Sequence, residues 1–205
     1  MTMTAAELTR CEWCGEDPVY RAYHDDEWGV PLHDERALFE QLCLEGQQAG
    51  LSWITVLKKR DHYRKRFHQF NIECVARMPD RSIEARLRDS GLIRNRLKLY
   101  AIRKNAQATL NLYESGYTLN SFLWDFVDGT PIDNHFRAQS EVPGNSTDSD
   151  AMSRALKRSG FCFVGTTICY ALMQATGLVN DHLVSCYRHD PVSYTHLTLP
   201  TTPYV

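Results

Sequence analysis

The chain has 205 residues, of which 43% are hydrophobic and 23% charged, and its formal net charge is -2. This composition is typical of one soluble globular domain, and the small negative charge argues against a protein that coats nucleic acid indiscriminately. No apolar run is long enough to span a membrane, the N-terminus lacks a signal peptide, and seven irregularly spaced cysteines fit a reducing cytosol, so we expect a cytoplasmic protein.

Helical periodicity dominates the chain and predicts one all-α domain over residues 10–187, after a disordered start at 1–9. Asp34 is a suitable N-cap for a helix that runs through Leu44, and Ser52 is one for a second helix. Further helices are expected at about 62–70, 82–89, 94–114, 119–127, 149–159 and 166–176. Alternating strand patterns are nearly absent.

The last stretch of the chain, from about Val192, differs in character from the rest. It is rich in threonine and proline, has no helical period, and resembles the translation of a sequencing-library adapter read in frame. We therefore expect residues 188–205 to be a tail outside the domain, foreign to the protein from about residue 192.

Basic residues gather in three runs, at 58–66, 86–104 and 154–158, while acidic residues crowd into 12–45. Such runs are commonly solvated helix faces, and this interpretation is favoured for any one of them. Together they also fit a local phosphate-binding face, so both interpretations stay open.

Metal-ligating residue types stand at both ends of the chain. His182 and Cys186 are four residues apart, which puts them on one side of a helix, and Cys11, Cys14 and His24 lie near the start. One cysteine and one histidine from the start would complete a Cys2His2 zinc set, structural because four protein ligands leave no open position. A buried cysteine beside an unrelated histidine is the alternative, whereas a redox pair of Cys11 and Cys14 lacks a βαβ context.

A glycine-punctuated segment at 155–177 could bind a DNA phosphate. One helix ends at Gly160, a short turn carries Phe161 and Phe163, and Gly165 opens the next helix. The pattern fits a helix-hairpin-helix unit, whose backbone N–H groups bind phosphate, and it equally fits a plain corner between two helices.

The segment 44–53 places a carboxylate, Glu45, at the end of an apolar helix and close in sequence to Trp53. With Trp13, Tyr20 and Tyr23 upstream, such a carboxylate could bind a purine's exocyclic amine while aromatic rings stack on its faces. From these residues alone, aromatic core packing and a solvated glutamate are the favoured explanation.

Four distinctive stretches change that balance: Tyr23 to Pro31 (YHDDEWGVP), Leu44 to Arg60 (LEGQQAGLSWITVLKKR), Gly165 to Tyr170 (GTTICY) and Gly177 to His182 (GLVNDH). Across about residues 10–187 the chain closely resembles the 3-methyladenine DNA glycosylase I (Tag) family, a branch of the helix-hairpin-helix glycosylases. The resemblance implies a helix-hairpin-helix glycosylase-like domain with one structural zinc that links the two terminal segments. Residue by residue, it implies that the zinc ligands are Cys11, His24, His182 and Cys186, and that the base pocket consists of Glu45, Tyr23, Trp53, Trp13 and Tyr20. It implies further that Gly50 and Leu51 form a wedge, which enters the gap left by a flipped nucleotide, and that Gly165 and Thr166 contact DNA from the hairpin.

The resemblance also implies the reaction: a monomer that removes 3-methyladenine from double-stranded DNA by hydrolysis, with Glu45 as the catalytic carboxylate. Related bifunctional enzymes carry a hairpin lysine where this chain has Thr166-Thr167, so no strand cleavage is expected. In many relatives an aspartate stands where this chain has Asn180. Three alternatives remain: a glycosylase for another altered base, a zinc-containing DNA-binding module without catalysis, and a zinc hydrolase, which four protein ligands argue against.

Overall fold

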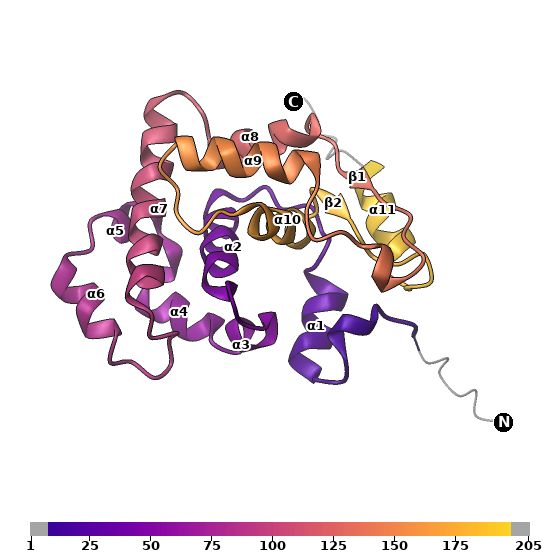
Figure 1. Cartoon of the computed structure of the whole chain (residues 1–205), viewed down its shortest axis with the longest axis horizontal. Coiled ribbons are helices and arrows are strands. Elements are labelled where there is room, and N and C mark those ends of the chain that lie inside the picture. The colour runs from indigo at the N-terminus through magenta and orange to yellow at the C-terminus, as the bar shows by residue number, and fades with distance from the viewer. Residues whose placement is uncertain (1–7, 198–205) are drawn as a thin grey trace, which may run out of the picture.

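The computed structural model describes residues 8–197, and helices dominate it (Figure 1). Its elements in chain order are η1 (Glu12–Cys14), α1 (Pro18–Asp26), α2 (Glu35–Gln48), α3 (Trp53–Leu57), α4 (Arg60–Arg66), η2 (His68–Phe70), α5 (Ile72–Ala76), α6 (Asp80–Arg86), α7 (Arg96–Glu114), α8 (Leu119–Trp124), η3 (Asp125–Val127), β1 (Ile132–Asp133), η4 (Gln139–Glu141), α9 (Thr147–Arg158), α10 (Thr166–Ala175), β2 (Val179–Asn180) and α11 (His189–Leu197). The prediction of a mainly helical protein is confirmed.

Helix starts follow the local chemistry of capping. Asp34 accepts a hydrogen bond from the backbone N–H of Ala37 at the start of α2, as the sequence predicts. Ser146 and Ser149 form a reciprocal capping box at the start of α9. Ser52 does precede α3, but its hydroxyl bonds the Thr55 hydroxyl instead of a backbone N–H.

Three helices lie outside the predicted set: α1, α5 and α11. Asp17 caps α1 and Pro18 occupies its first position, which are good start features, but this short helix buries only Tyr23 and His24. The helix is only nine residues long, and a helix this short is marginal on its own, so tertiary packing decides it. The two strands are only two residues each and pair in parallel, Ile132 with Val179 and Asp133 with Asn180.

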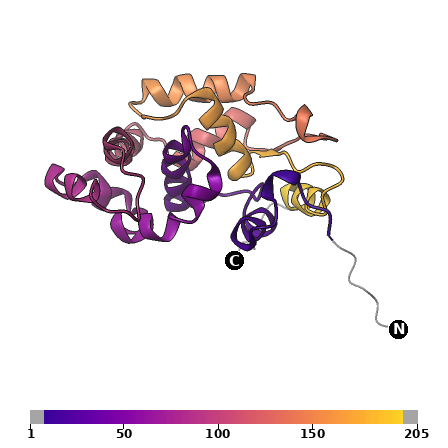
Figure 2. The ribbon, with the colours of Figure 1, turned by 60° about the horizontal axis from the view of Figure 1, so that its bottom comes forward.

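Helix α2 lies at the centre of the core and packs against α3, α7, α8 and α10. Nine of its 14 residues are buried, including Leu38, Phe39, Leu42 and Leu44, so the helix is covered by its neighbours over most of its length. Helix α7 runs beside it and carries α5 and α6, while α9 and α10 pack on the other side (Figures 1 and 2). This central position makes α2 a rigid support for the polar residues at its C-terminal end.

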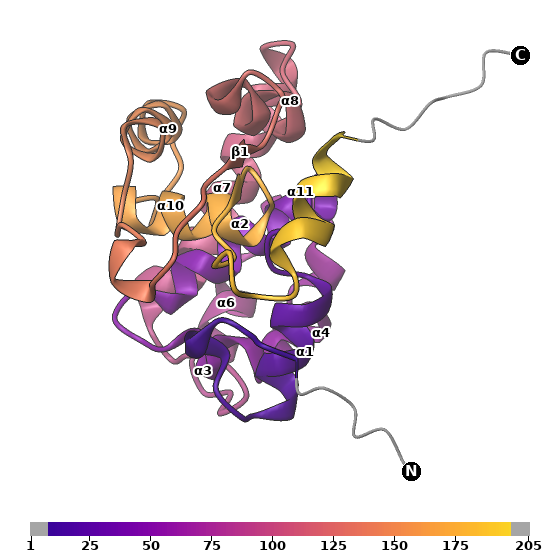
Figure 3. The ribbon, with the colours of Figure 1, turned by 90° about the vertical axis from the view of Figure 1, so that its right-hand side faces the viewer.

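The two terminal segments of the described chain meet. The backbone N–H of Tyr187 donates to the carbonyl of Thr9, and that of Leu183 donates to the Cys11 sulfur. Figures 2 and 3 both show α1 beside the segment that leads into α11. Leu183 and Cys11, which are 172 positions apart in sequence, therefore lie side by side.

Helix α11 extends the packed chain past residue 187, where the sequence predicts the domain to end. Val192 is fully buried, and the Asn180 side chain donates to the Ser193 hydroxyl. The expected foreign origin of the chain from about residue 192 stays a prediction, and so does the expected disorder of residues 1–9, most of which lie outside the described residues. Among residues 8–197, no helix is long and apolar enough to cross a membrane.

Gly177 brings the end of α10 against the segment that follows α1. It has a φ of +71°, and a Cβ there would lie 2.5 Å from Pro31 N and 2.7 Å from Gly29 O. The close approach permits hydrogen bonds from Gly29 N–H to the Gln174 carbonyl and from Leu32 N–H to the Thr176 carbonyl. Only glycine satisfies both the left-handed backbone and this contact.

Candidate functional site

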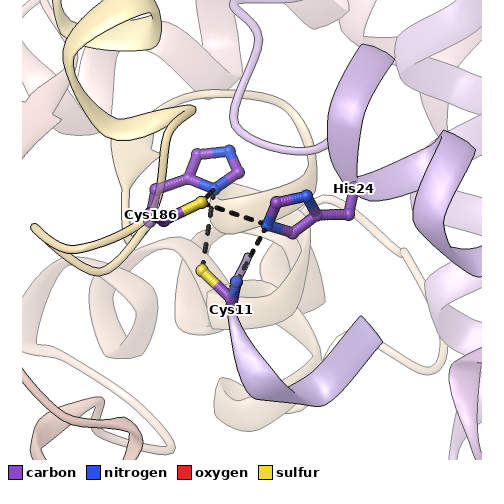
Figure 4. A group of neighbouring side chains, drawn as sticks. Cys11, His24 and Cys186 are labelled. Atoms are coloured by element: carbon purple, nitrogen blue, oxygen red, sulfur yellow. Dashed lines mark hydrogen bonds between the residues drawn. The ribbon is translucent and has the colours of Figure 1, made fainter. Parts of the chain in front are cut away.

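Four buried side chains from the two terminal segments converge on one point. Cys11 precedes η1, His24 comes from α1, and His182 and Cys186 come from the segment between β2 and α11 (Figure 4). The Cys11 and Cys186 sulfurs lie 3.7 and 3.6 Å from His182 Nδ1, and the Cys186 sulfur lies 3.5 Å from His24 Nε2. The sequence prediction that a helix carries His182 and Cys186 is wrong, because residues 181–188 form turns and irregular backbone.

This cluster has the dimensions of a tetrahedral zinc site. Zinc bonds of about 2.3 Å to sulfur and 2.0–2.1 Å to nitrogen separate neighbouring ligand atoms by roughly 3.5 Å. The remaining imidazole nitrogens are held as in known zinc sites: His24 Nδ1 is 2.8 Å from an Asp25 oxygen, and His182 Nε2 is 3.0 Å from the Trp28 carbonyl. Backbone N–H groups of Leu183 and Arg188 donate to the two sulfurs. The residues present therefore fit the metal that the sequence predicts.

The two thiols of the cluster differ in acidity, because the hydrogen bond between them raises the pKa of Cys11 and leaves Cys186 the readier to ionise. Hydrogen bonds with Cys11, His182 and His24 lower the pKa of the Cys186 thiol. Asp25 is partly buried, yet hydrogen bonds from Arg10 and His24 lower its pKa to about 2, so this carboxylate stays ionised beside His24. Cys14 lies outside the cluster, because its thiol donates to the Cys11 carbonyl instead.

Next to the cluster lies a cavity of about 180 Å³, bounded by α1, α2, α3 and α10. A dry cavity of about 150 Å³ in another protein admits benzene, so this one has room for a flat aromatic ligand. All five residues that the sequence predicts as a base pocket line it: Trp13, Tyr20, Tyr23, Glu45 and Trp53. The alternative of a solvated Glu45 is wrong, since this side chain is 2% exposed.

Glu45 is an unusual group to bury. Gln41 donates to one of its oxygens at 2.7 Å, while the other oxygen, Oε2, has no hydrogen-bond partner among the described residues. Burial raises its pKa to about 8, against the opposing effect of the Gln41 hydrogen bond. Burying a carboxylate without full hydrogen bonding costs several kcal/mol, which is the usual mark of a functional position.

Two indole N–H groups are also buried without a hydrogen-bond partner. Trp13 Nε1 and Trp53 Nε1 are buried and unpartnered within the described chain, and both side chains line the cavity with Glu45. The rings form a connected aromatic wall, with centroid separations of 5.5 Å between Tyr23 and Trp53 and 5.0 Å between Trp13 and Tyr20. A ligand that fills the cavity would find stacking surfaces together with one acceptor and two donors.

The cavity contains residues that sequence reasoning missed. Trp28 lines it, and its ring lies 4.9 Å from Trp13 and 4.6 Å from the His182 imidazole, so it joins the cavity to the metal cluster. Trp28 stands inside the Tyr23–Pro31 string, and that membership was the available signal. Gln48 and Gln174 also line the cavity.

A second buried carboxylate, Asp181, lines the same cavity. Its oxygens accept hydrogen bonds from Tyr170, Gln174 and Asn134, at 2.7, 2.7 and 2.8 Å. The neighbouring Asn180 instead donates toward Asp133 and Ser193, away from the cavity. Thus the residue that stands for the relatives' aspartate turns away from the cavity, and the next residue faces it.

Gly50 and Leu51, the predicted wedge, lie at the tip of the turn between α2 and α3. Gly50 has a φ of +75°, and the Leu51 side chain is 42% exposed. Lys98, only 6% exposed, donates to the carbonyls of Gln47 and Ala49 at 2.8 and 2.6 Å. This buried lysine satisfies the last carbonyls of α2 and holds the turn in place.

Gly165 and Thr166, the predicted hairpin contacts, form the N-cap and first residue of α10. The turn from α9 is packed tightly: Phe161 is buried, and Phe163 lies against Gly46, where an added Cβ would be 3.1 Å from its Cβ. The Thr166 hydroxyl contacts Asp150 and Ser149 of α9. The turn between α9 and α10 is therefore packed directly against the helix that carries Glu45.

The basic runs are extensively paired with acids. Ion pairs join Lys58 to Asp17, Arg60 to Glu27, Arg64 to Glu40, Arg66 to Asp89, Arg96 to Glu84 and Arg103 to Asp80. This pairing favours the interpretation of solvated, charge-balanced helix faces for much of runs 58–66 and 86–104.

Comparisons with known proteins agree with this architecture. Residues 13–189 match the family model described as methyladenine glycosylase. The chain is 54% identical over 179 residues, 87% of its length and 96% of the relative's, to "DNA-3-methyladenine glycosylase 1" of Escherichia coli (strain K12). A crystal structure of 3-methyladenine DNA glycosylase I (TAG) superposes with a TM-score of 0.87 at 52% identity, covering 88% of this chain and 100% of that one. A form of such an enzyme solved in complex with 3-methyladenine superposes with a TM-score of 0.85 at 36% identity, over 88% and 97% of the two chains.

Proposed function

The chain belongs to the methyladenine glycosylase family, and on that basis we propose that it removes 3-methyladenine from alkylated double-stranded DNA, leaving an abasic site. The observation that carries this proposal is the unpartnered oxygen of buried Glu45 inside a cavity walled by tryptophan and tyrosine. A flipped purine supplies what those groups lack, because its faces stack and its edges hydrogen-bond.

The positive charge of the lesion explains why a carboxylate is buried in the cavity. Methylation at N3 makes the adenine base cationic, and a cation beside Glu45 offsets the desolvation that raises its pKa to about 8. The bound lesion therefore favours the ionised carboxylate, which accepts hydrogen bonds from the N6 amine, while the Trp13 and Trp53 rings add cation–π attraction. Guanine has a carbonyl at that edge, so the same carboxylate disfavours 7-methylguanine.

The chemistry required of the protein is hydrolysis. Water forms a bond to the sugar carbon C1′ and releases one proton to the solvent, while the C1′–N9 bond breaks and its electron pair stays with the base. The 3-methyladenine leaves neutral because it was cationic before. No lysine lines the cavity among the described residues, and the hairpin presents Thr166 and Thr167. Without an amine nucleophile no Schiff base forms, and the strand stays intact.

Two further features form the rest of the proposed DNA interface: the turn between α2 and α3, and the N-terminus of α10. Leu51 is the wedge that fills the gap in the base stack once the damaged nucleotide has flipped out. The N-terminus of α10, at Gly165, binds a phosphate of the DNA backbone. Replacing Leu51 by alanine should slow single-turnover excision from duplex DNA by about tenfold, since a wedge offsets an unstacking cost of a few kcal/mol. Leu97→Ala, at another exposed leucine, is the control, and equal rates for both variants would contradict the wedge.

We further propose one structural Zn²⁺ per chain, held by Cys11, His24, His182 and Cys186. When bound, the ion supplies a cross-link between the two terminal segments and takes no part in the reaction. The imidazole of His182 contacts the Trp28 ring, so the cross-link also fixes one wall of the cavity.

The experiment that tests the function is incubation of the protein with methylated duplex DNA, followed by chromatography of the released bases. We expect 3-methyladenine with little 7-methylguanine, and strands that break only after alkali is added. Absence of release from folded, zinc-loaded protein that still binds abasic DNA would establish a binding module instead. Release of a different altered base would keep the reaction and change the substrate.

A further inference from the structure

Outside the cavity and the Cys2His2 cluster, a second group of metal-ligating side chains gathers on the surface. Asp133 ends β1, His135 follows two residues later, and His189 is the first residue of α11. One ligand atom from each lies within 4.8 Å of the others. We propose that these three residues form a second divalent-metal site, with Zn²⁺ as the preferred ion.

The ligand set has a recognised chemistry. Two imidazoles and one carboxylate suit Zn²⁺ and its late first-row neighbours, whereas Mg²⁺ and Ca²⁺ require oxygen ligands. A tetrahedral zinc separates its nitrogen and oxygen ligands by about 3.3 Å. His189 Nε2 and an Asp133 oxygen are already 3.7 Å apart, and the imidazole centroids are 5.3 Å apart. The third ligand atom, on the exposed His135 side chain, lies within 4.8 Å of the other two.

Two neighbours orient these ligands as the outer groups of metal sites do. His189 Nδ1 lies 3.1 Å from an Asp190 oxygen, while Nε2 faces an Asp133 oxygen at 3.7 Å and the Asn134 carbonyl at 3.4 Å. With Nδ1 as the donor to Asp190, the Nε2 lone pair is available to an ion placed among these oxygens. The Asn180 amide donates to the Asp133 oxygen at 3.0 Å. Because the His189 side chain is only 6% exposed, its ring is held in place before any ion arrives.

The three ligands come from two separate segments, and an ion between them links β1 to α11. His189 lies inside the stretch that matches the family model, although α11 continues into the part expected to be foreign. Asp181, one residue after β2, faces the cavity, whereas Asn180 faces Asp133. The second site therefore lies on the opposite side of this strand from the cavity, and its consequence is attachment of α11 rather than catalysis.

The test is titration of the full chain with Zn²⁺, after the tightly bound metal has been counted and free metal removed. We expect one additional Zn²⁺ per chain with an affinity on the order of micromolar, and a rise in melting temperature of about 3–6 °C at tenfold excess over the dissociation constant. His135→Asn and Asp133→Asn, both at partly exposed side chains, should each weaken this binding about tenfold or more. His68→Asn, at an exposed left-handed residue that asparagine tolerates, should leave it unchanged.

Co²⁺ separates the two sites spectroscopically. Cobalt at the second site should lack thiolate-to-metal charge-transfer absorption, which only the cysteine cluster can produce, and this thiolate-free signal should vanish in His135→Asn. Wild-type protein that takes up no second Zn²⁺, or second-site binding that the His135 and Asp133 variants leave intact, would overturn the proposal. Neither result depends on the base-excision activity.

Discussion

Replacing Glu45 by glutamine should make the protein more stable and less active at neutral pH. In the unfolded chain this carboxyl ionises near its ordinary pKa of 4.5, whereas burial raises the pKa to about 8 in the folded protein. Between these values the unfolded state loses its proton and the folded state keeps it, so stability falls as the pH rises. At about 1.4 kcal/mol per pH unit, Glu45 costs about 3 kcal/mol of folding stability at pH 7.

Glutamine removes that cost but leaves a buried N–H2 group where Oε2 has no partner, which costs about 1 kcal/mol or more. The net gain is then about 1–2 kcal/mol at pH 7, a melting temperature higher by about 2–8 °C. The gain should shrink as the pH falls and disappear near pH 5. Urea unfolding of wild type and variant at pH 5, 6 and 7 measures this difference, and any effect of zinc on unfolding is shared by both proteins.

Excision should respond in the opposite direction. Glutamine cannot become an anion beside the cationic lesion, so the single-turnover rate on 3-methyladenine DNA should fall by about a hundredfold. Glu114→Gln, at an exposed position, should change neither stability nor excision. Wild-type excision by Glu45→Gln would refute the pocket, and a stability difference independent of pH would refute the buried, protonated carboxyl.

Three further outcomes are expected. If the ionised form of Glu45 binds the lesion, kcat/KM should rise with pH up to about 8, which is the pKa of Glu45 in the free protein. The rise should be missing in Glu45→Gln, and a wild-type kcat/KM that does not change with pH would contradict the prediction. Cys186→Ser should lower the zinc content, measured by atomic absorption, well below one per chain and should lower the melting temperature by ~10 °C. Cys74→Ser, at an exposed cysteine, should do neither. Full zinc content in Cys186→Ser would exclude Cys186 as a ligand. Gly177→Ala should lower the free energy of unfolding, measured in urea, by about 3 kcal/mol or more, because its Cβ would overlap backbone atoms 2.5 Å away. Gly116→Ala, with a similar φ but open space around it, should lower it by only about 1–2 kcal/mol. Equal decreases would show that the close approach at Gly177 is not essential.

Much of the helical architecture could be predicted from the sequence, because its causes are local. Asp34 precedes an apolar run and caps α2 as expected, and the long periodic stretch at 94–114 becomes α7. Candidate zinc ligands could be chosen because cysteine and histidine are the residue types that bind this metal. Helices α1 and α5 have only nine and five residues, too few to be stable on local signals alone, so the sequence does not predict them and tertiary packing decides them.

By itself, then, the sequence determined the longer helices and the residue types available for chemistry, since capping and periodicity act within a few residues. Only the tertiary structure decided how those residues are used. It turned Asp181 rather than Asn180 into the cavity, excluded Cys14 from the metal cluster, and brought Lys98 to the end of α2 across 51 positions of sequence. Such choices depend on contacts between distant segments and on small rotations of the backbone, neither of which leaves a periodic trace in the order of residues.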